Sequence, residues 1–174
     1  MDDKYTMMLS VAAVVGAIMM IISVFFTWVD VNIAGVHVFS LTGWEIFDEW
    51  RDVLDLKNAI LPVLSIICGV LVMIMMGVIL LDDKDKYRKL NMILGLATSI
   101  LSICMMVYAL VVTQKEWSFL FITIRLFDYL VLGFWITVAG SAISFLGGLI
   151  PFLMNVKENR ALKKDNAFDG SGPQ

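Results

Sequence analysis

The sequence predicts an all-α integral membrane protein: a four-transmembrane-helix bundle with a short extracellular β-hairpin and an interfacial amphipathic helix. Three observations predict this fold class. Four long runs lack Asp, Glu, Lys, Arg and His. Of the 174 residues, 60% are apolar and the mean hydropathy is +0.86, and the basic residues gather on alternate connecting segments. A soluble domain of this length does not hide so large an apolar fraction in one core.

The four apolar runs are long enough to cross a bilayer. They cover residues 7–29, 59–81, 90–113 and 129–154 and are 23 to 26 residues long. About 20 helical residues, rising ~1.5 Å each, span a hydrocarbon core of ~30 Å. We therefore expect one transmembrane domain over residues 1–154, with outer loops at 30–58 and 114–128. Residues 155–174 are expected to form a cytoplasmic tail with a disordered end.

The basic residues divide unevenly between the two sides of such a bundle. Nine fall on one side: Lys4, Lys84, Lys86, Arg88, Lys89, Lys157, Arg160, Lys163 and Lys164. Four fall on the other: Arg51, Lys57, Lys115 and Arg125. Because cytoplasmic loops carry an excess of Lys and Arg, both termini are expected in the cytoplasm of a multi-pass cell-membrane protein.

Small and weakly polar residues recur along each run at alternating steps of three and four. The last run carries Gly133, Thr137, Gly140, Ser144 and Gly147, and the other three carry similar stripes. Lipid tails are as apolar as Leu, so helices in a bilayer associate through close backbone approach and interhelical hydrogen bonds. We expect these stripes to pack the helices into a left-handed bundle. The alternative is that Asn91, Thr98 and Ser102 line a polar pathway.

The first outer loop divides into two predicted elements. Alternation of apolar and polar residues on both sides of Ala34-Gly35 predicts a β-hairpin over residues 29–39. Thr42-Gly43-Trp44-Glu45 has capping-box spacing and predicts a helix from there through Leu56. An interaction face is predicted on this helix: Trp44, Phe47, Trp50 and Leu54. The opposite face is acidic, which favours docking on protein over binding to anionic lipid.

The second outer loop contains a stretch, residues 117–124, that is too apolar for an ordinary solvated loop. We expect it to dip into the membrane interface. A chain break near Asp128, as an N-cap, is needed before the last helix. Arg125 and Asp128 are spaced to pair as an interfacial anchor, with a ligand site as the alternative.

No catalytic, cofactor-binding or metal-binding residue is predicted. His37 is the only histidine, so a multi-histidine zinc site or a Ser-His-Asp arrangement has no further histidine to draw on, and a surface position is expected. Cys68 and Cys104 are expected to be buried free thiols at similar depth, because no Cys-x-x-Cys is present. The 12 methionines offer soft ligands for Cu(I), but adaptable apolar filling is the better account.

The order of these features resembles the claudin and peripheral-myelin-protein type of four-helix membrane protein. The likeness consists of four spans, a larger first outer loop of β character, and Trp28 followed by Gly43-Trp44. That family has Gly-Leu-Trp and two disulfide-bonded cysteines in this loop; here the Leu and both cysteines are missing. The resemblance implies membrane organisation or adhesion through the outer loops.

These features favour a non-enzymatic membrane interaction protein, acting as an accessory subunit, scaffold or adhesion module through its first extracellular loop. Its expected partners are the lipid bilayer and another membrane or extracellular protein, or a second copy of itself; no nucleic acid or cofactor is expected. The alternative is a small-solute or cation transporter or channel acting as an oligomer. A membrane enzyme comes third.

Overall fold

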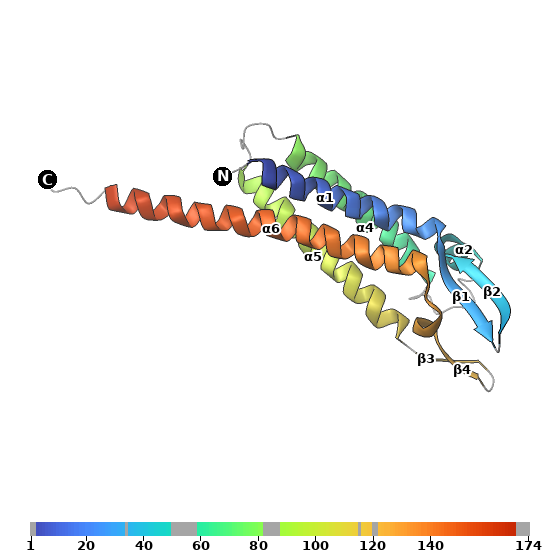
Figure 1. Ribbon diagram of the computed structural model, residues 1–174. Helices are drawn as coiled ribbons and strands as arrows, with labels where there is room; N and C mark the ends of the chain where they lie inside the picture. Colours follow the sequence, from blue (N-terminus) through green and yellow to red (C-terminus); the bar gives the residue numbers. More distant parts are fainter. Residues whose placement is uncertain are drawn as a thin grey trace.

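The computed structural model describes residues 3–33, 35–49, 59–81, 88–114, 116–119 and 122–169. Its four long helices are α1 (Asp3–Ile22), α4 (Leu61–Leu80), α5 (Arg88–Thr113) and α6 (Leu132–Asp169). They run side by side in an elongated bundle (Figure 1). Within the described part of the chain, four helices are long and apolar enough to cross a membrane, as predicted: Tyr5–Phe25, Leu61–Leu80, Lys89–Thr113 and Leu132–Lys157.

The predicted end of the first helix and the predicted start of the last helix are wrong. The first apolar run was expected to be helical to residue 29, but α1 ends at Ile22, a 3-10 turn covers Ser23–Phe25, and a strand begins at Thr27. Hydropathy alone does not separate a buried strand from a buried helix, so Thr27 and Trp28, predicted as helix, belong to β1 instead. The last helix begins at Leu132 rather than residue 129, after a second 3-10 turn at Leu126–Tyr129.

The predicted cytoplasmic tail begins inside a helix. Helix α6 runs through Pro151 and continues to Asp169, so most of residues 155–174 is a direct extension of the last span. Figure 1 shows this extension projecting beyond the ends of the other helices. The expected disordered end at 170–174 lies outside the described residues.

Helix α6 lies between α1 and α5, and α4 packs against α1 and α5 on the other side of the bundle. The core takes apolar side chains from all four helices, among them Ala17, Val72, Ala109 and Phe134. Among the described residues, ten Ser and Thr side chains are buried as well, and every long helix contributes at least one of them. This core therefore combines apolar packing with short hydroxyl side chains, as expected where helices approach closely.

The segment between α1 and α4, predicted as the first outer loop, forms the predicted hairpin. Strands β1 (Thr27–Ile33) and β2 (Val36–Thr42) pair antiparallel, and Gly35 has φ +82°, a left-handed conformation that glycine adopts without strain. The pairing is longer than the predicted 29–39. Helix α2 (Gly43–Asp48) follows directly. We call β1, β2 and α2 together the platform, and Figure 1 shows it at one end of the bundle.

The segment between α5 and α6, predicted as the second outer loop, holds a hairpin that was not predicted. Strands β3 (Glu116–Phe119) and β4 (Ile122–Arg125) pair antiparallel in full register. Residues 117–124 have the β-branched and aromatic composition of strands, but they lack the turn residues that identify a hairpin from sequence. The expected chain break near Asp128 is present as the 3-10 turn that precedes α6. The predicted N-cap role is wrong, because Asp128 lies inside this turn and α6 begins only at Leu132.

Candidate interaction site at the platform

Trp28 in β1 fastens the platform to the bundle. Its side chain is 2% exposed, and its indole N–H donates a hydrogen bond of 2.8 Å to the Ser23 carbonyl. Its ring meets Phe134 of α6 edge-on, with centroids 5.9 Å apart and planes at 82°. A buried tryptophan with a satisfied N–H contributes a large apolar contact in one orientation. The sequence singled out Trp28 only through a family resemblance, and the structure gives it this packing role.

Two glycines approach the same indole. A Cβ atom on Gly43 would lie 2.9 Å from Trp28 Nε1, and one on Gly133 would lie 2.5 Å from Trp28 Cδ1. Both distances are shorter than real Cβ contacts allow. Glycine at these two positions therefore lets the start of α2 and the start of α6 both rest against Trp28.

Backbone hydrogen bonds add to this attachment. The Val131 N–H donates to the Trp28 carbonyl over 2.9 Å, and the Gly43 N–H donates to the Phe26 carbonyl over 3.3 Å. Val29 also forms an isolated antiparallel bridge with Leu130. The platform is thus joined to Phe26, just after the 3-10 turn that follows α1, and to the segment before α6 by main-chain contacts as well as by packing.

A cluster of buried hydroxyls lies next to the Trp28 anchor. Ser23 and Thr137 hydroxyls are 2.5 Å apart, and the hydroxyls of Ser23 and Ser65 both donate to the Met20 carbonyl, over 2.7 and 2.8 Å. These residues come from the end of α1, from α4 and from α6. Interhelical hydrogen bonds of this kind hold helices together where lipid offers no polar alternative.

Helix α2 begins with the predicted capping box. The Glu45 N–H donates to the Thr42 hydroxyl over 3.2 Å, and the Thr42 N–H donates to the Glu45 carboxylate over 2.7 Å. The hydrogen bonds from Thr42, the backbone one first, lower the pKa of Glu45. Glu45 therefore carries its charge at neutral pH while it closes the first turn of α2.

The side chains of α2 divide differently from the predicted apolar face. Ile46 is buried together with Gly43, whereas Trp44 is 46% exposed and Phe47 is half-buried. The Trp44 and Phe47 rings lie 6.1 Å apart. The helix ends at Asp48 rather than Leu56, and Trp50 and Leu54, the other two predicted interaction residues, lie outside the described residues. The apolar periodicity of the sequence did not identify Ile46 as the buried residue. Its apolar neighbours already form one continuous face of the predicted helix without it.

The hairpin carries exposed apolar side chains away from the bundle. Val36 is 66% exposed and Val38 is 51% exposed, whereas Val29 and Val31 on the opposite strand are buried.

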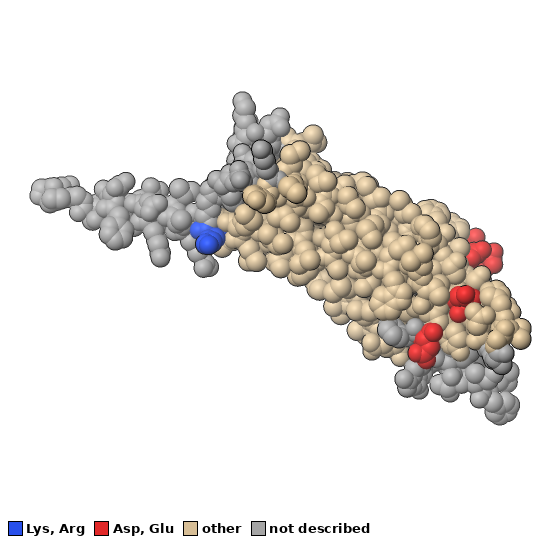
Figure 2. All heavy atoms as spheres, viewed as in Figure 1, with Lys and Arg blue, Asp and Glu red and all other residues tan. Residues whose placement is uncertain are grey.

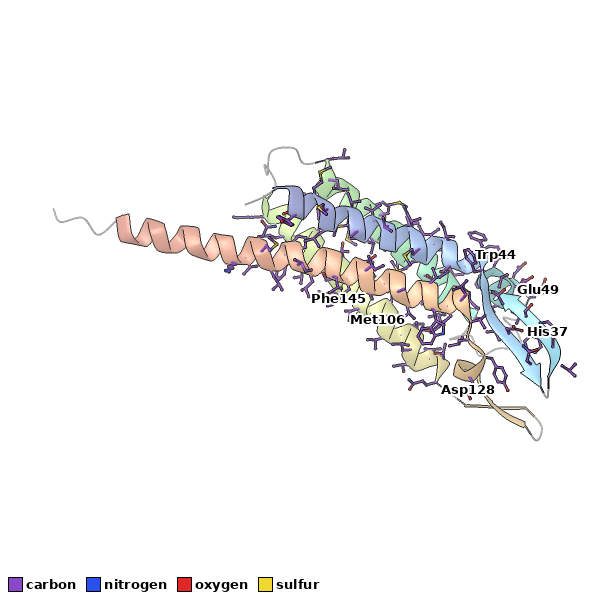
Figure 3. All side chains as sticks on the ribbon, in the orientation of Figure 1. His37, Trp44, Glu49, Met106, Asp128 and Phe145 are labelled. Carbon is purple, nitrogen blue, oxygen red and sulfur yellow. The ribbon has the colours of Figure 1, made fainter. Side chains whose placement is uncertain are left out.

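His37 is exposed, as predicted, and its Nε2 lies 3.2 Å from Asp30 Oδ1. An exposed pair of this type contributes at most about 1 kcal/mol. Figure 3 shows His37 on the hairpin and Glu49 beside α2, both at the platform end.

The predicted packing stripe of the last helix lies against α1, except at its first residue, Gly133, which meets Trp28 of β1. Its five residues, Gly133, Thr137, Gly140, Ser144 and Gly147, are all buried. A Cβ on Gly140 would lie 2.6 Å from the Gly16 carbonyl, and one on Gly147 would lie 2.7 Å from the Ala13 Cβ. The Ser144 hydroxyl donates to the Ala13 carbonyl over 3.0 Å. Helices α1 and α6 thus cross at backbone contact distance.

The remaining sequence candidates do not converge on one place. Cys68 is buried, but Cys104 is exposed on the side of α5, so the expectation of two buried thiols is wrong for Cys104; both are free. Thr98 and Ser102 are buried. Among the described residues, no group of three or more His, Cys, Asp or Glu side chains is placed to hold a metal ion. The side chain of Arg125 lies outside the described residues, so the Arg125–Asp128 pair stays a prediction.

No protein-family model matches this chain, and no curated protein and no solved structure matches it either. The site is therefore interpreted from its own geometry.

Proposed function

We propose that this protein is a non-enzymatic membrane interaction protein that uses the platform, its first outer loop, to bind another protein. In this role it serves as an accessory subunit, scaffold or adhesion module. The observation that carries the proposal is the difference in side-chain burial between the two strands of the hairpin. One strand is buried and anchored through Trp28, while the other exposes Val36 and Val38. An exposed apolar patch on a firmly held element is typical of a protein-binding surface.

The proposed orientation places the platform outside the cell and both termini in the cytoplasm. Among the residues with described side chains, Lys89 lies in the first turn of α5 and Lys157 ends the candidate span of α6. Both helix ends lie opposite the platform in Figure 1, which supports this orientation. On the face drawn in Figure 2, acidic side chains gather at the platform end and a basic one at the other. The claudin-like resemblance points to the same arrangement and remains part of the proposal.

The experiment compares two exposed residues of the same hairpin. Full-length protein carrying Val38→Ser loses an apolar contact, and the matched control Asn32→Ser shortens an exposed polar side chain on the paired strand. We expect the Val38 variant to capture its partner from the native membrane at least severalfold less well than the control, with unchanged folding. Equal capture by both variants, or no stoichiometric partner with the unaltered protein, contradicts the proposal.

The alternative, a small-solute or cation transporter acting as an oligomer, is favoured by one observation. The hydroxyls of Ser10 and Ser102 are buried with no hydrogen-bond partner in the described part of the chain. A buried unpaired hydroxyl is unfavourable unless a solute or water satisfies it. Flux into vesicles containing only this protein, abolished by Ser102→Ala and kept in Val38→Ser, would favour this alternative.

A further inference from the structure

Four exposed aromatic side chains lie at the level where the platform meets the bundle: Phe25, Phe26, Trp44 and Trp135. The Phe26 carbonyl fixes this level, because it accepts from the Gly43 N–H and would lie 3.0 Å from a Cβ on Gly133. Trp44 directly follows Gly43, and Trp135 lies two residues beyond Gly133. Tryptophan and other aromatic side chains concentrate at the membrane–water interface, so this level marks the bilayer surface in the proposed orientation.

Trp44 differs from the other three in its electrostatic surroundings. Glu45 is its chain neighbour, and Asp48 and Glu49 follow within five residues and are exposed. The Phe47 ring stands 6.1 Å away at 53° to the indole, so two neighbouring aromatic rings lie on the same short helix as these acidic residues, with Glu49 at its C-cap. Figure 3 shows Trp44 and Glu49 at the same end of the molecule. On the face drawn in Figure 2, the basic side chain lies at the opposite end.

We propose that Trp44 and the acidic side chains of α2 and its C-cap bind the ammonium group of a zwitterionic phospholipid headgroup in the outer leaflet. The proposal rests on the outward orientation of the platform given above. An ammonium group is attracted to the face of an indole ring, and nearby carboxylates strengthen that attraction. An anionic headgroup has no ammonium group to place near the three carboxylates. Its negatively charged phosphate would face them instead, and like charges repel. The position of Trp44 at the level of Phe25 and Trp135 favours lipid over a soluble protein as its occupant.

The test follows individual tryptophans by fluorine NMR. Full-length protein labelled with 5-fluorotryptophan is purified in an uncharged detergent, and the resonances of Trp44 and Trp135 are assigned with Trp44→Phe and Trp135→Phe. Dihexanoyl-phosphatidylcholine and dihexanoyl-phosphatidylglycerol are then added separately at matched concentrations. Trp135 serves as the internal control, because it lies at the same level without acidic neighbours in sequence.

We expect the Trp44 resonance to saturate at about three- to fivefold lower concentration of the choline lipid than of the glycerol lipid, whereas Trp135 shows no preference. The exposed double change Asp48→Asn, Glu49→Gln should reduce the preference of Trp44 to that of Trp135. Equal response to both lipids, no response, or a shift only on adding a captured protein overturns the proposal. These outcomes are independent of the capture test, which depends on Val38.

Discussion

A Cβ atom on Gly133 would lie 2.5 Å from Cδ1 of Trp28, so the start of α6 and the base of the platform fit together only because position 133 has no side chain. This contact joins residues more than a hundred positions apart in the chain. It determines where β1 leaves the bundle and, through β1, how the whole platform is presented.

Gly133→Ala should therefore destabilise the protein. The added methyl group must displace the buried indole, and overpacking of this kind lowers the free energy of unfolding by about 1–3 kcal/mol. Gly77→Ala is the matched control, because a Cβ there meets nothing within 4 Å and alanine favours a helix over glycine. Denaturant titration in detergent measures both. A loss of stability that is equal in the two variants would contradict the packing described for Trp28.

Gly140→Leu should separate α1 from α6. Its Cβ alone would lie 2.6 Å from the Gly16 carbonyl, which belongs to backbone that has no rotamer to adopt instead. We expect a loss of at least about 2 kcal/mol in the free energy of unfolding. The neighbouring change Ala139→Leu places the same side chain at an exposed position of the same helix and should have little effect. Similar stability of both variants would show that this stripe does not face α1.

Thr42→Ala should weaken the start of α2. The change removes the acceptor for the Glu45 N–H, and loss of an N-cap destabilises a helix by about 1 kcal/mol. Amide hydrogen exchange of residues 45–48 should accelerate by severalfold. Thr42→Ser keeps the hydroxyl and should retain the protection. If the alanine variant exchanges at the rate of the unaltered protein, the capping box does not hold α2.

Acid should weaken the same helix through Glu45. Hydrogen bonds from Thr42 lower the pKa of Glu45 in the folded protein, below the value of about 4.3 expected in an unfolded chain. The stabilisation is therefore complete above the unfolded-chain pKa and is lost as the pH falls through the lower folded pKa. Protection factors of the α2 amides should stay constant at neutral pH and fall as the pH is lowered below the unfolded-chain pKa of about 4.3. In Glu45→Gln they should change less, because the amide does not titrate.

The proposed topology predicts which positions an impermeant thiol reagent reaches in intact cells. In a background with Cys68→Ala and Cys104→Ala, single cysteines at Asp48 and Lys115 should be labelled, because both positions are expected outside. Cysteines at Lys86 and Asn159 should be labelled only after the membrane is opened. The reverse pattern would place both termini outside and would contradict the proposed orientation.

Local patterns predicted much of this fold. Uninterrupted apolar runs identified the four long helices, because length and hydropathy are properties of the segment alone. The Ala34-Gly35 turn and the Thr42–Glu45 capping box were also predicted, since each depends on residues a few positions apart. The β3–β4 hairpin was missed, because its turn lacks the residues that usually mark one.

The sequence by itself determined which segments are apolar, where helix α2 begins and which helix stripes are small enough for close contact. Only the tertiary structure decided that Trp28 lies against both Gly43 and Gly133, that Ile46 rather than Trp44 is buried, and that Cys104 is exposed. The physical reason is that burial depends on which distant segment arrives opposite a residue. A tryptophan in a loop has the same local pattern whether its indole is enclosed by a second helix or left at the surface.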